Sequence, residues 1–263
     1  MPADLGVMMY TVLDQARADL DGTLARLAEL GYLGIETYGL VEHFGPARVR
    51  SAIDAAGLTL TSAHTPFPAG PDAERLLDVN QELGAEVLVW SMEREEFASP
   101  AAIRQGVARV NEAAERAATR GMRIAYHNHY AEFSQVFDGR QGYDLLLELL
   151  DERVLIELDA YWALLGGADP AEILARLGER VRFVHVKDGP AVSYEQDVLM
   201  PIGEGQIDWT RTLSVPSGLR WHLVELERLH VETFEALRRS YNHLVGRGLS
   251  RGATVPTRSE ERA

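Results

Sequence analysis

The stretch "VNEAAERAATRGMRIAYHNH", Val110 to His129, contains the unit from which the fold is predicted. It begins with the apolar spacing of an amphipathic helix, reaches a glycine, and continues as a short apolar run that ends in polar residues. Gly121 stands where a helix C-terminus needs a residue that tolerates the left-handed conformation. The stretch therefore predicts a helix followed closely by a buried strand.

The same unit recurs along the chain, with glycines at Gly31, Gly57 and Gly84 between a helical pattern and a strand pattern. Extending it predicts eight strands, near Leu5–Met9, Gly34–Thr37, Leu58–His64, Glu86–Trp90, Met122–His129, Val154–Asp159, Val181–Lys187 and Leu219–Glu225. Strands that alternate with helices indicate a parallel sheet, and eight units in a chain of 263 residues predict an α/β fold, a closed (β/α)8 TIM barrel. A doubly wound open sheet is the competing fold. It would need a glycine-rich phosphate loop after its first strand, and "MMYTVLDQARADL" has none.

Composition limits the class of protein. The chain is 46% hydrophobic and 25% charged, which is typical of a soluble globular domain. Its formal net charge of −14 argues against binding a nucleic-acid backbone, and the lack of cysteine excludes disulfides and thiolate metal sites and favours the cytoplasm. We expect no membrane span. We predict one barrel domain over residues 1–246 and a flexible polar C-terminal tail over residues 247–263.

Ionisable residues gather where the predicted strands end. Catalytic residues of such barrels stand at the C-terminal ends of the strands and point inward, and alternation along each strand identifies the inner row. The inner rows of the last four strands end in ionisable residues, namely His127 and His129, Asp159, His185 and Lys187, and Glu225. One such residue is more often a solvated or hydrogen-bonded group, but four adjacent strands with this pattern favour a joint site. Carboxylates with an imidazole suit Mn²⁺ or Mg²⁺ best, with Co²⁺ and Zn²⁺ as further candidates.

Four motifs give the chain a family resemblance: "YHNHYAEF", "ELDAYWALLGGADP", "FVHVKD" and "IGEGQIDW". Together they resemble the sugar phosphate isomerase/epimerase family, also called the xylose-isomerase-like barrels. The resemblance runs from "LGVMMYTVLD" to about Leu244. It implies a divalent metal held by Glu, Asp, His and Glu from the later strands, with Asp159, His185 and Glu225 at three of these positions.

The fifth strand departs from part of this family. Members that epimerise free ketoses carry a glutamate at the position of His127, which serves as both ligand and base. The "YHNH" form resembles instead the branch that contains inosose dehydratases and enzymes acting on 3-keto sugars or their glycosides. The resemblance then implies that Glu132 supplies the first ligand, with His127 as the alternative ligand. His127 and His129 would act as bases, Glu225 is a further base candidate, and Lys187 would neutralise an enolate or bind an oxyanion.

Four more residues are candidates for substrate binding. Glu36, His64 and Trp90 end the second, third and fourth predicted strands, and Glu204 lies in the loop before the last strand. For Glu36, an ion pair at the rim of the barrel is as good an interpretation as substrate binding. For Trp90, a structural role as a packed aromatic side chain is an equal alternative.

These residues predict a divalent-metal-dependent isomerase or epimerase that acts on a keto sugar or sugar derivative through an enediolate intermediate. One alternative is a lyase or dehydratase of a keto-inositol or 3-keto glycoside, which shares the first proton abstraction. A second is a carbohydrate-binding barrel without catalysis. An apurinic endonuclease would need more histidines and a basic face, which the net charge of −14 disfavours. We expect a small-molecule sugar as the partner, with no nucleic acid or membrane, and homo-oligomerisation is left open.

Overall fold

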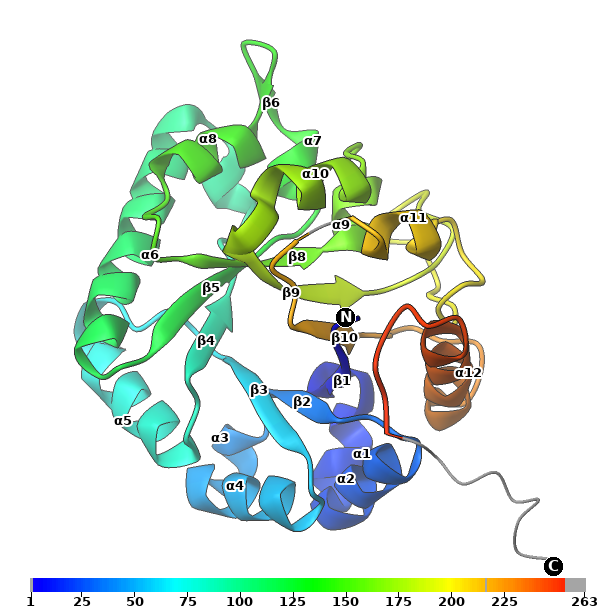
Figure 1. Cartoon of the computed structure of the whole chain (residues 1–263). Coiled ribbons are helices and arrows are strands. Elements are labelled where there is room, and N and C mark those ends of the chain that lie inside the picture. The colour runs from blue at the N-terminus through cyan, green and yellow to red at the C-terminus, as the bar shows by residue number, and fades with distance from the viewer. Residues whose placement is uncertain (1, 216, 254–263) are drawn as a thin grey trace, which may run out of the picture.

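The computed structural model describes residues 2–215 and 217–253 and has a closed barrel of parallel strands surrounded by helices (Figure 1). The strands follow one another around the barrel in the order β1-β10-β9-β8-β5-β4-β3-β2. Their bounds are β1 Asp4–Met8, β2 Gly34–Tyr38, β3 Thr59–His64, β4 Val87–Trp90, β5 Arg123–His127, β8 Leu155–Asp159, β9 Val181–Val186 and β10 Trp221–Val224. The prediction of a (β/α)8 barrel is confirmed.

Helices form the outer layer of the barrel, as Figure 1 shows. The α-helices are α1 Leu13–Ala18, α2 Leu20–Glu29, α3 Val41–Phe44, α4 Pro46–Ala55, α5 Ala73–Leu83, α6 Pro100–Thr119, α7 Ala131–Ser134, α8 Gly142–Leu149, α9 Ala160–Leu165, α10 Pro170–Leu177, α11 Trp209–Leu213 and α12 Thr233–Gly246. Short 3₁₀ turns lie at Met9–Val12, Gly70–Asp72, Arg94–Phe97 and Gly178–Arg180. A small antiparallel hairpin, β6 Val136–Phe137 and β7 Arg140–Gln141, was not predicted.

The unit that opens the sequence analysis forms in the expected way. Helix α6 begins at Ser99, whose hydroxyl accepts a hydrogen bond from the Ala102 backbone N–H at 3.2 Å, and Pro100 occupies its first turn. After the helix, Gly121 adopts a φ of 73° and lets the chain reverse directly into β5. The same device of a capping Asp and a following Pro starts α10 at Asp169.

Apolar side chains fill the barrel below the polar strand ends. Five of them form a separate inner core, namely Val89, Ala125, Leu155, Phe183 and Leu223. Four of these stand in the rows that alternation predicted to face inward. Because these apolar side chains pack the lower part of the barrel, the polar residues further along the same rows lie above a packed apolar layer.

The end of the described chain packs against β1. The Arg251 backbone N–H donates to the Ala3 carbonyl at 2.8 Å, and the Leu5 N–H donates to the Arg251 carbonyl at 2.8 Å. The Ser250 hydroxyl lies 2.7 Å from Nδ1 of His222 on β10. The first part of the predicted tail therefore contacts the barrel strands, whereas residues 254–263 lie outside the described residues. Among residues 2–215 and 217–253, no helix is long and apolar enough to cross a membrane.

Candidate metal centre and active site

His185, on β9, lies at the centre of a buried cluster of polar residues. Its Nε2 atom is 3.1 Å from Oε1 of Glu36 and 2.9 Å from Oε1 of Glu157. Its Nδ1 atom is 2.7 Å from Oε2 of Glu225. Since β2, β8 and β10 supply these three carboxylates, the imidazole contacts side chains from several parts of the barrel wall.

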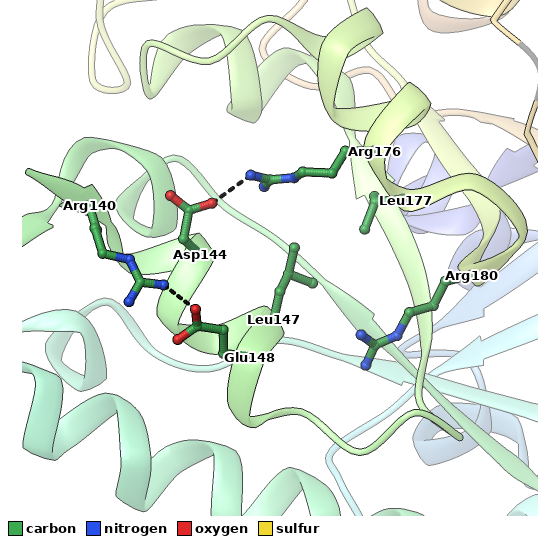
Figure 2. A pocket seen from close by; sticks show the side chains of 7 residues that line it. All are labelled: Arg140, Asp144, Leu147, Glu148, Arg176, Leu177 and Arg180. Atoms are coloured by element: carbon green, nitrogen blue, oxygen red, sulfur yellow. Dashed lines mark hydrogen bonds and ion pairs between the residues drawn. The ribbon is translucent and has the colours of Figure 1, made fainter.

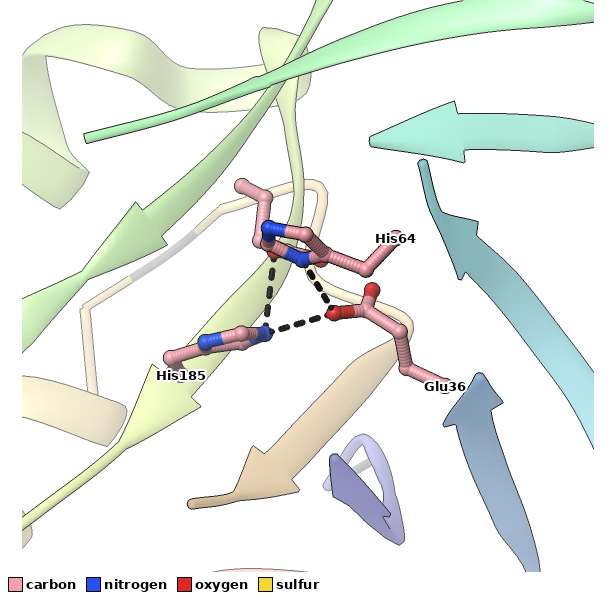
Figure 3. A group of neighbouring side chains, drawn as sticks. Glu36, His64 and His185 are labelled. Atoms are coloured by element: carbon pink, nitrogen blue, oxygen red, sulfur yellow. Dashed lines mark hydrogen bonds and ion pairs between the residues drawn. The ribbon is translucent and has the colours of Figure 1, made fainter. Parts of the chain in front are cut away.

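Glu36 is held in place from two further sides. The Ser62 hydroxyl donates to its Oε2 atom at 2.5 Å, and Nδ1 of His64 lies 2.9 Å from its Oε1 atom. Figure 3 shows the Glu36 carboxylate directed toward the rings of both His64 and His185. Glu36 is completely buried, and its carboxylate contacts Ser62, His64 and His185.

Lys187 joins two carboxylates at the mouth of the barrel. Its Nζ atom lies 3.1 Å from Oδ2 of Asp159 and 3.1 Å from Oε1 of Glu225, and 4.8 Å from the centre of the Trp162 ring. Burial alone would raise the pKa of Glu225, but Lys187 and His185 outweigh it and lower that pKa to about 2. Glu225 is therefore a carboxylate at neutral pH.

A cavity of about 410 Å³ on the outer layer of helices is a poorer candidate site (Figure 2). Its arginines already have partners, because Arg176 donates to Asp144 at 2.6 Å and Arg140 pairs with Glu148 at 2.6 Å. Arg180 donates to backbone carbonyls, including that of Val154. These paired side chains leave no cluster of catalytic groups facing that cavity.

A second cavity, of about 320 Å³, opens directly above the His185 cluster. It is lined by Met8, Tyr10, Tyr38, His64, Trp90, Ser91, Glu93, His127, His129, Trp162, Lys187, Tyr194, Glu225 and Glu227. Burial, then the charge of Lys187, lowers the pKa of His129 to about 4, and burial, then His185, lowers the pKa of His127 well below its ordinary value. Both imidazoles are therefore neutral at pH 7 and can accept a proton.

The buried polar residues suit a divalent cation. Two groups bring potential ligand atoms within 4.8 Å of one another, His127 with Asp159 and His185, and Glu36 with His64, Glu157 and His185. Among the buried side-chain atoms of the described residues, Oδ2 of Asp159, Nδ1 of His185 and Oε2 of Glu157 have no hydrogen-bond partner. The first two lie within ion-pair distance of Lys187 and Glu225, but without hydrogen-bond geometry. A cation beside Asp159, His185 and Glu225 would satisfy the first two atoms and reduce the repulsion between the Asp159 and Glu225 carboxylates.

Glu132 takes a different position from the three other predicted ligands. Its Oε1 atom accepts hydrogen bonds from the Tyr126 hydroxyl at 2.9 Å and from the His129 backbone N–H at 3.0 Å. Tyr126 packs in the outer core, between the barrel and the helices. Neither potential ligand group includes Glu132 or Glu225. Glu225 nevertheless lies 2.7 Å from Nδ1 of His185, whereas Glu132 contacts Tyr126 and the His129 backbone, and the ligand roles of both stay predictions.

Of the four predicted substrate-binding residues, two line the cavity and two do not. His64 and Trp90 line the cavity, but Glu36 does not. Glu204 forms an ion pair with Arg239 of α12 and is also absent from the cavity lining. The motif that contains Glu204 packs against buried Asp188, which accepts hydrogen bonds from the Gly203 N–H and the Trp209 indole.

Sequence reasoning assigned no role to Glu157, Trp162 or Tyr194. Glu157 stands in the same inner row as Asp159, so alternation along β8 could have identified it. Tyr194 lies in the long loop after β9, where no periodic pattern predicts which side chain turns toward the cavity.

Comparisons with known proteins agree with this architecture. A sequence model described as a xylose isomerase-like TIM barrel matches residues 24–215. The chain is 36% identical to the inosose dehydratase of Geobacillus kaustophilus over 90 residues, which are 34% of this chain and 27% of that protein. It is 34% identical to the 3-dehydroshikimate dehydratase of Pseudomonas aeruginosa over 125 residues, which are 47% of this chain and 19% of that protein. The matched parts therefore span less than two thirds of the length of either relative.

Solved structures share the fold at lower identity. A sugar phosphate isomerase/epimerase from Parabacteroides distasonis superposes with a TM-score of 0.77 at 23% identity, covering 95% of this chain and 96% of that one. The IOLI protein, solved with a bound zinc atom, superposes with a TM-score of 0.68 at 18% identity, covering 92% of this chain and 97% of that one. At these identities the likeness establishes the barrel fold alone.

Proposed function

The chain belongs to the xylose isomerase-like TIM barrel family, and from that premise we propose that it is a divalent-metal-dependent isomerase or epimerase of a keto sugar or sugar derivative. The family contains isomerases, epimerases and dehydratases, so the reaction class is part of the proposal. One observation carries it. Neutral His127 and His129 face a cavity across from the Glu225 carboxylate, above a buried acidic cluster that fits a cation.

Asp159, His185 and Glu225 are the proposed metal ligands. The oxygen-rich set favours Mn²⁺ or Mg²⁺, although a structural neighbour was solved with zinc. A divalent ion held by these residues supplies Lewis-acid polarisation of a carbonyl oxygen. Glu132 remains a further proposed ligand, to be tested against its observed contacts with Tyr126 and His129.

The histidines of the β5 end are the proposed bases. A neutral imidazole of His127 or His129 removes the proton from the carbon beside the carbonyl, and the Lys187 ammonium stabilises the negative charge on the enediolate oxygen. Return of a proton to the opposite face of the same carbon gives the epimer, and its return to the neighbouring carbon gives the isomer. Glu225 is the second candidate for proton transfer. Because β8 and β9 separate β10 from β5, it approaches the cavity from another side.

Dehydration is the second candidate function, and the named relatives specifically favour it. Two of the matched relatives are named as dehydratases. The same proton abstraction, followed by loss of a hydroxyl group from the β carbon, would give this outcome, and the protonated histidine could donate the proton that leaves with the hydroxyl as water.

The test begins with metal analysis of the purified protein and continues with substrate C–H exchange in D₂O across a panel of keto sugars and cyclic keto-polyols. We expect bound divalent metal and metal-dependent incorporation of deuterium beside the carbonyl. Product analysis by NMR then separates epimerisation, isomerisation and loss of water. Bound metal without exchange from any compound would contradict an enzymatic role and favour a carbohydrate-binding barrel.

A further inference from the structure

Glu157 contacts two imidazoles that have different proposed roles. Its Oε1 atom lies 2.9 Å from Nε2 of His185, the proposed ligand, and 3.2 Å from Nδ1 of His127, the proposed base. All three side chains are buried, and they come from β8, β9 and β5. One carboxylate oxygen therefore joins the candidate metal centre to the candidate proton-transfer group.

These contacts determine which ring nitrogen of each histidine is free. Oε1 of Glu157 faces a nitrogen of each ring, whereas its Oε2 atom has no hydrogen-bond partner, so Oε1 is the acceptor and the ring nitrogen that faces it carries the N–H. For His185 that nitrogen is Nε2. Its Nδ1 atom faces Oε2 of Glu225 at 2.7 Å, so the Nδ1 lone pair becomes available when a metal ion replaces the proton there, and the N–H then stays on Nε2. For His127 the N–H is at Nδ1, which leaves the Nε2 lone pair free to accept a proton.

We infer that Glu157 is a positioning residue that fixes both tautomers, presenting Nδ1 of His185 to the metal and Nε2 of His127 to the substrate. The inference rests on the proposed function, because it assigns His185 as a ligand and His127 as a base. Carboxylates that accept the second N–H of a metal-binding histidine are a general feature of metal sites, and their loss typically weakens metal binding by about 10–100-fold.

Glu36 supplies the internal comparison. It also lies within hydrogen-bond distance of Nε2 of His185, at 3.1 Å, but its other contacts are to Ser62 and His64. Both of its oxygens are therefore already engaged by protein groups. For this reason we assign the deeper group of Glu36, His64, Glu157 and His185 to the support of His185 and not to a second cation.

The experiment measures tautomers directly, in the whole protein with ¹⁵N-labelled histidine and no substrate. Long-range ¹H–¹⁵N spectra of the metal-free protein at neutral pH should show His127 with its proton on Nδ1 and His185 with both nitrogens protonated, because the carboxylates around His185 outweigh its burial and raise its pKa. Addition of Zn²⁺ should shift Nδ1 of His185 and leave its Nε2 protonated. The opposite tautomer at His127, or at zinc-bound His185, would overturn the inference, and this result needs no variant to fold.

Variants separate positioning from general stability. Glu157→Gln should weaken Zn²⁺ binding, measured by chelator competition, by about 10–100-fold and should mix the tautomers of His127. Glu36→Gln should weaken Zn²⁺ binding and leave His127 unchanged. Glu148→Gln removes one carboxylate on the outer layer of helices, where it pairs with Arg140, and should leave both readouts unchanged. Thermal unfolding of each metal-free variant checks the fold.

Two results would count against Glu157 as a positioning residue. One is a folded Glu157→Gln protein with unchanged zinc affinity and unchanged tautomers. The other is two zinc ions per wild-type chain with one lost in Glu157→Gln, which would make the deep group a cation site. Because tautomers are read without substrate, a protein that shows them but exchanges no substrate proton would contradict only the proposed function.

Discussion

The two carboxylate oxygens of Asp159 have different partners, one in the backbone of α9 and one at the proposed metal site. Its Oδ1 atom accepts a hydrogen bond from the Trp162 backbone N–H at 2.8 Å and caps α9, and its Oδ2 atom is directed toward Lys187. Burial raises the pKa of Asp159, although the charge of Lys187 acts in the opposite direction. An ionised Asp159 inside the barrel therefore costs desolvation free energy. A residue that only capped a helix would not need to be placed in the barrel beside His185.

Asp159→Asn should therefore abolish retention of the metal and with it activity, while the fold remains intact. The amide oxygen can still cap α9, but the neutral side chain is a much weaker ligand. Metal content by elemental analysis and thermal unfolding together check this. Asp169→Asn is a matched control, since Asp169 caps α10 through the Ala171 N–H at 2.9 Å and is absent from the cavity lining. Stoichiometric metal in Asp159→Asn would contradict the assignment.

Glu132 leads to a pH prediction for the metal-free protein. Burial raises its pKa to about 8, so the folded state holds a proton that the unfolded state loses near pH 4.5. Its contribution to stability is complete below that lower pKa and is lost as the pH rises to about 8. Wild type should therefore lose stability across this range, by on the order of a few kcal/mol from this group.

Glu132→Gln should flatten that dependence, measured as the denaturation midpoint between pH 5 and pH 8. It should also keep its metal if the carboxylate only supports Tyr126 and His129, and lose it if Glu132 is a ligand as the sequence predicted. An unchanged pH profile would show that Glu132 is not the group that titrates.

The sequence predicted the positions of residues accurately within the strands and poorly in the segments that follow the strands. Alternation placed Asp159, His185 and Glu225 in inner rows. In the structure His185 contacts Glu225, and Lys187 pairs with both Asp159 and Glu225. Glu132 lies after β5, where α7 turns the chain and alternation no longer applies. Glu204 pairs with Arg239, a distant residue on α12 that no local pattern indicates.

At the scale of elements, β5 is the strand whose end carries most of the proposed chemistry. The strand ends at His127, and His129 follows in the next turn with the two ring centres 5.1 Å apart. Both rings line the cavity, which agrees with the prediction that the two side chains belong to the same inner row.

His127→Ala and His129→Ala should each retain metal yet lose substrate C–H exchange, by about 10²–10⁴-fold for the more important base. The physical reason is that each removes a neutral imidazole from the cavity without removing a carboxylate ligand. Metal content and deuterium incorporation are measured on the same samples. If His127 is instead a ligand, its variant should lose metal, and Glu132→Gln should be nearly silent.

The regular elements were the predictable ones. All eight barrel strands overlap the predicted ranges, because helix and strand periods differ clearly in sequence. The β6–β7 hairpin was missed because each strand has only two residues. Its turn at Asp138 and Gly139, both with positive φ, is a recognised hairpin signal that could have revealed it.

At the scale of the whole molecule, the barrel closes where its first and last strands meet. β1 pairs with β10 in parallel, with Asp4 opposite Trp221 and Val7 opposite Val224. Closure was predictable from the number of units, but the segment that covers this seam was not. Residues 249–253 lack apolar periodicity, and the contacts they make are mainly backbone hydrogen bonds, which a sequence pattern does not encode.

Two truncations test how much this segment contributes. A chain that ends after Gly248 lacks the bonds from Arg251 to Ala3 and Leu5 and the bond from the Ala253 N–H to the Gly31 carbonyl, whereas a chain that ends after Ala253 keeps them. At about 1 kcal/mol for each net hydrogen bond, and ~2–4 °C per kcal/mol for a chain of this size, the shorter chain should unfold several degrees lower. The two proteins differ only in residues 249–253, so thermal unfolding isolates that segment. Equal midpoints would instead support the prediction from sequence that residues 247–263 form a flexible tail.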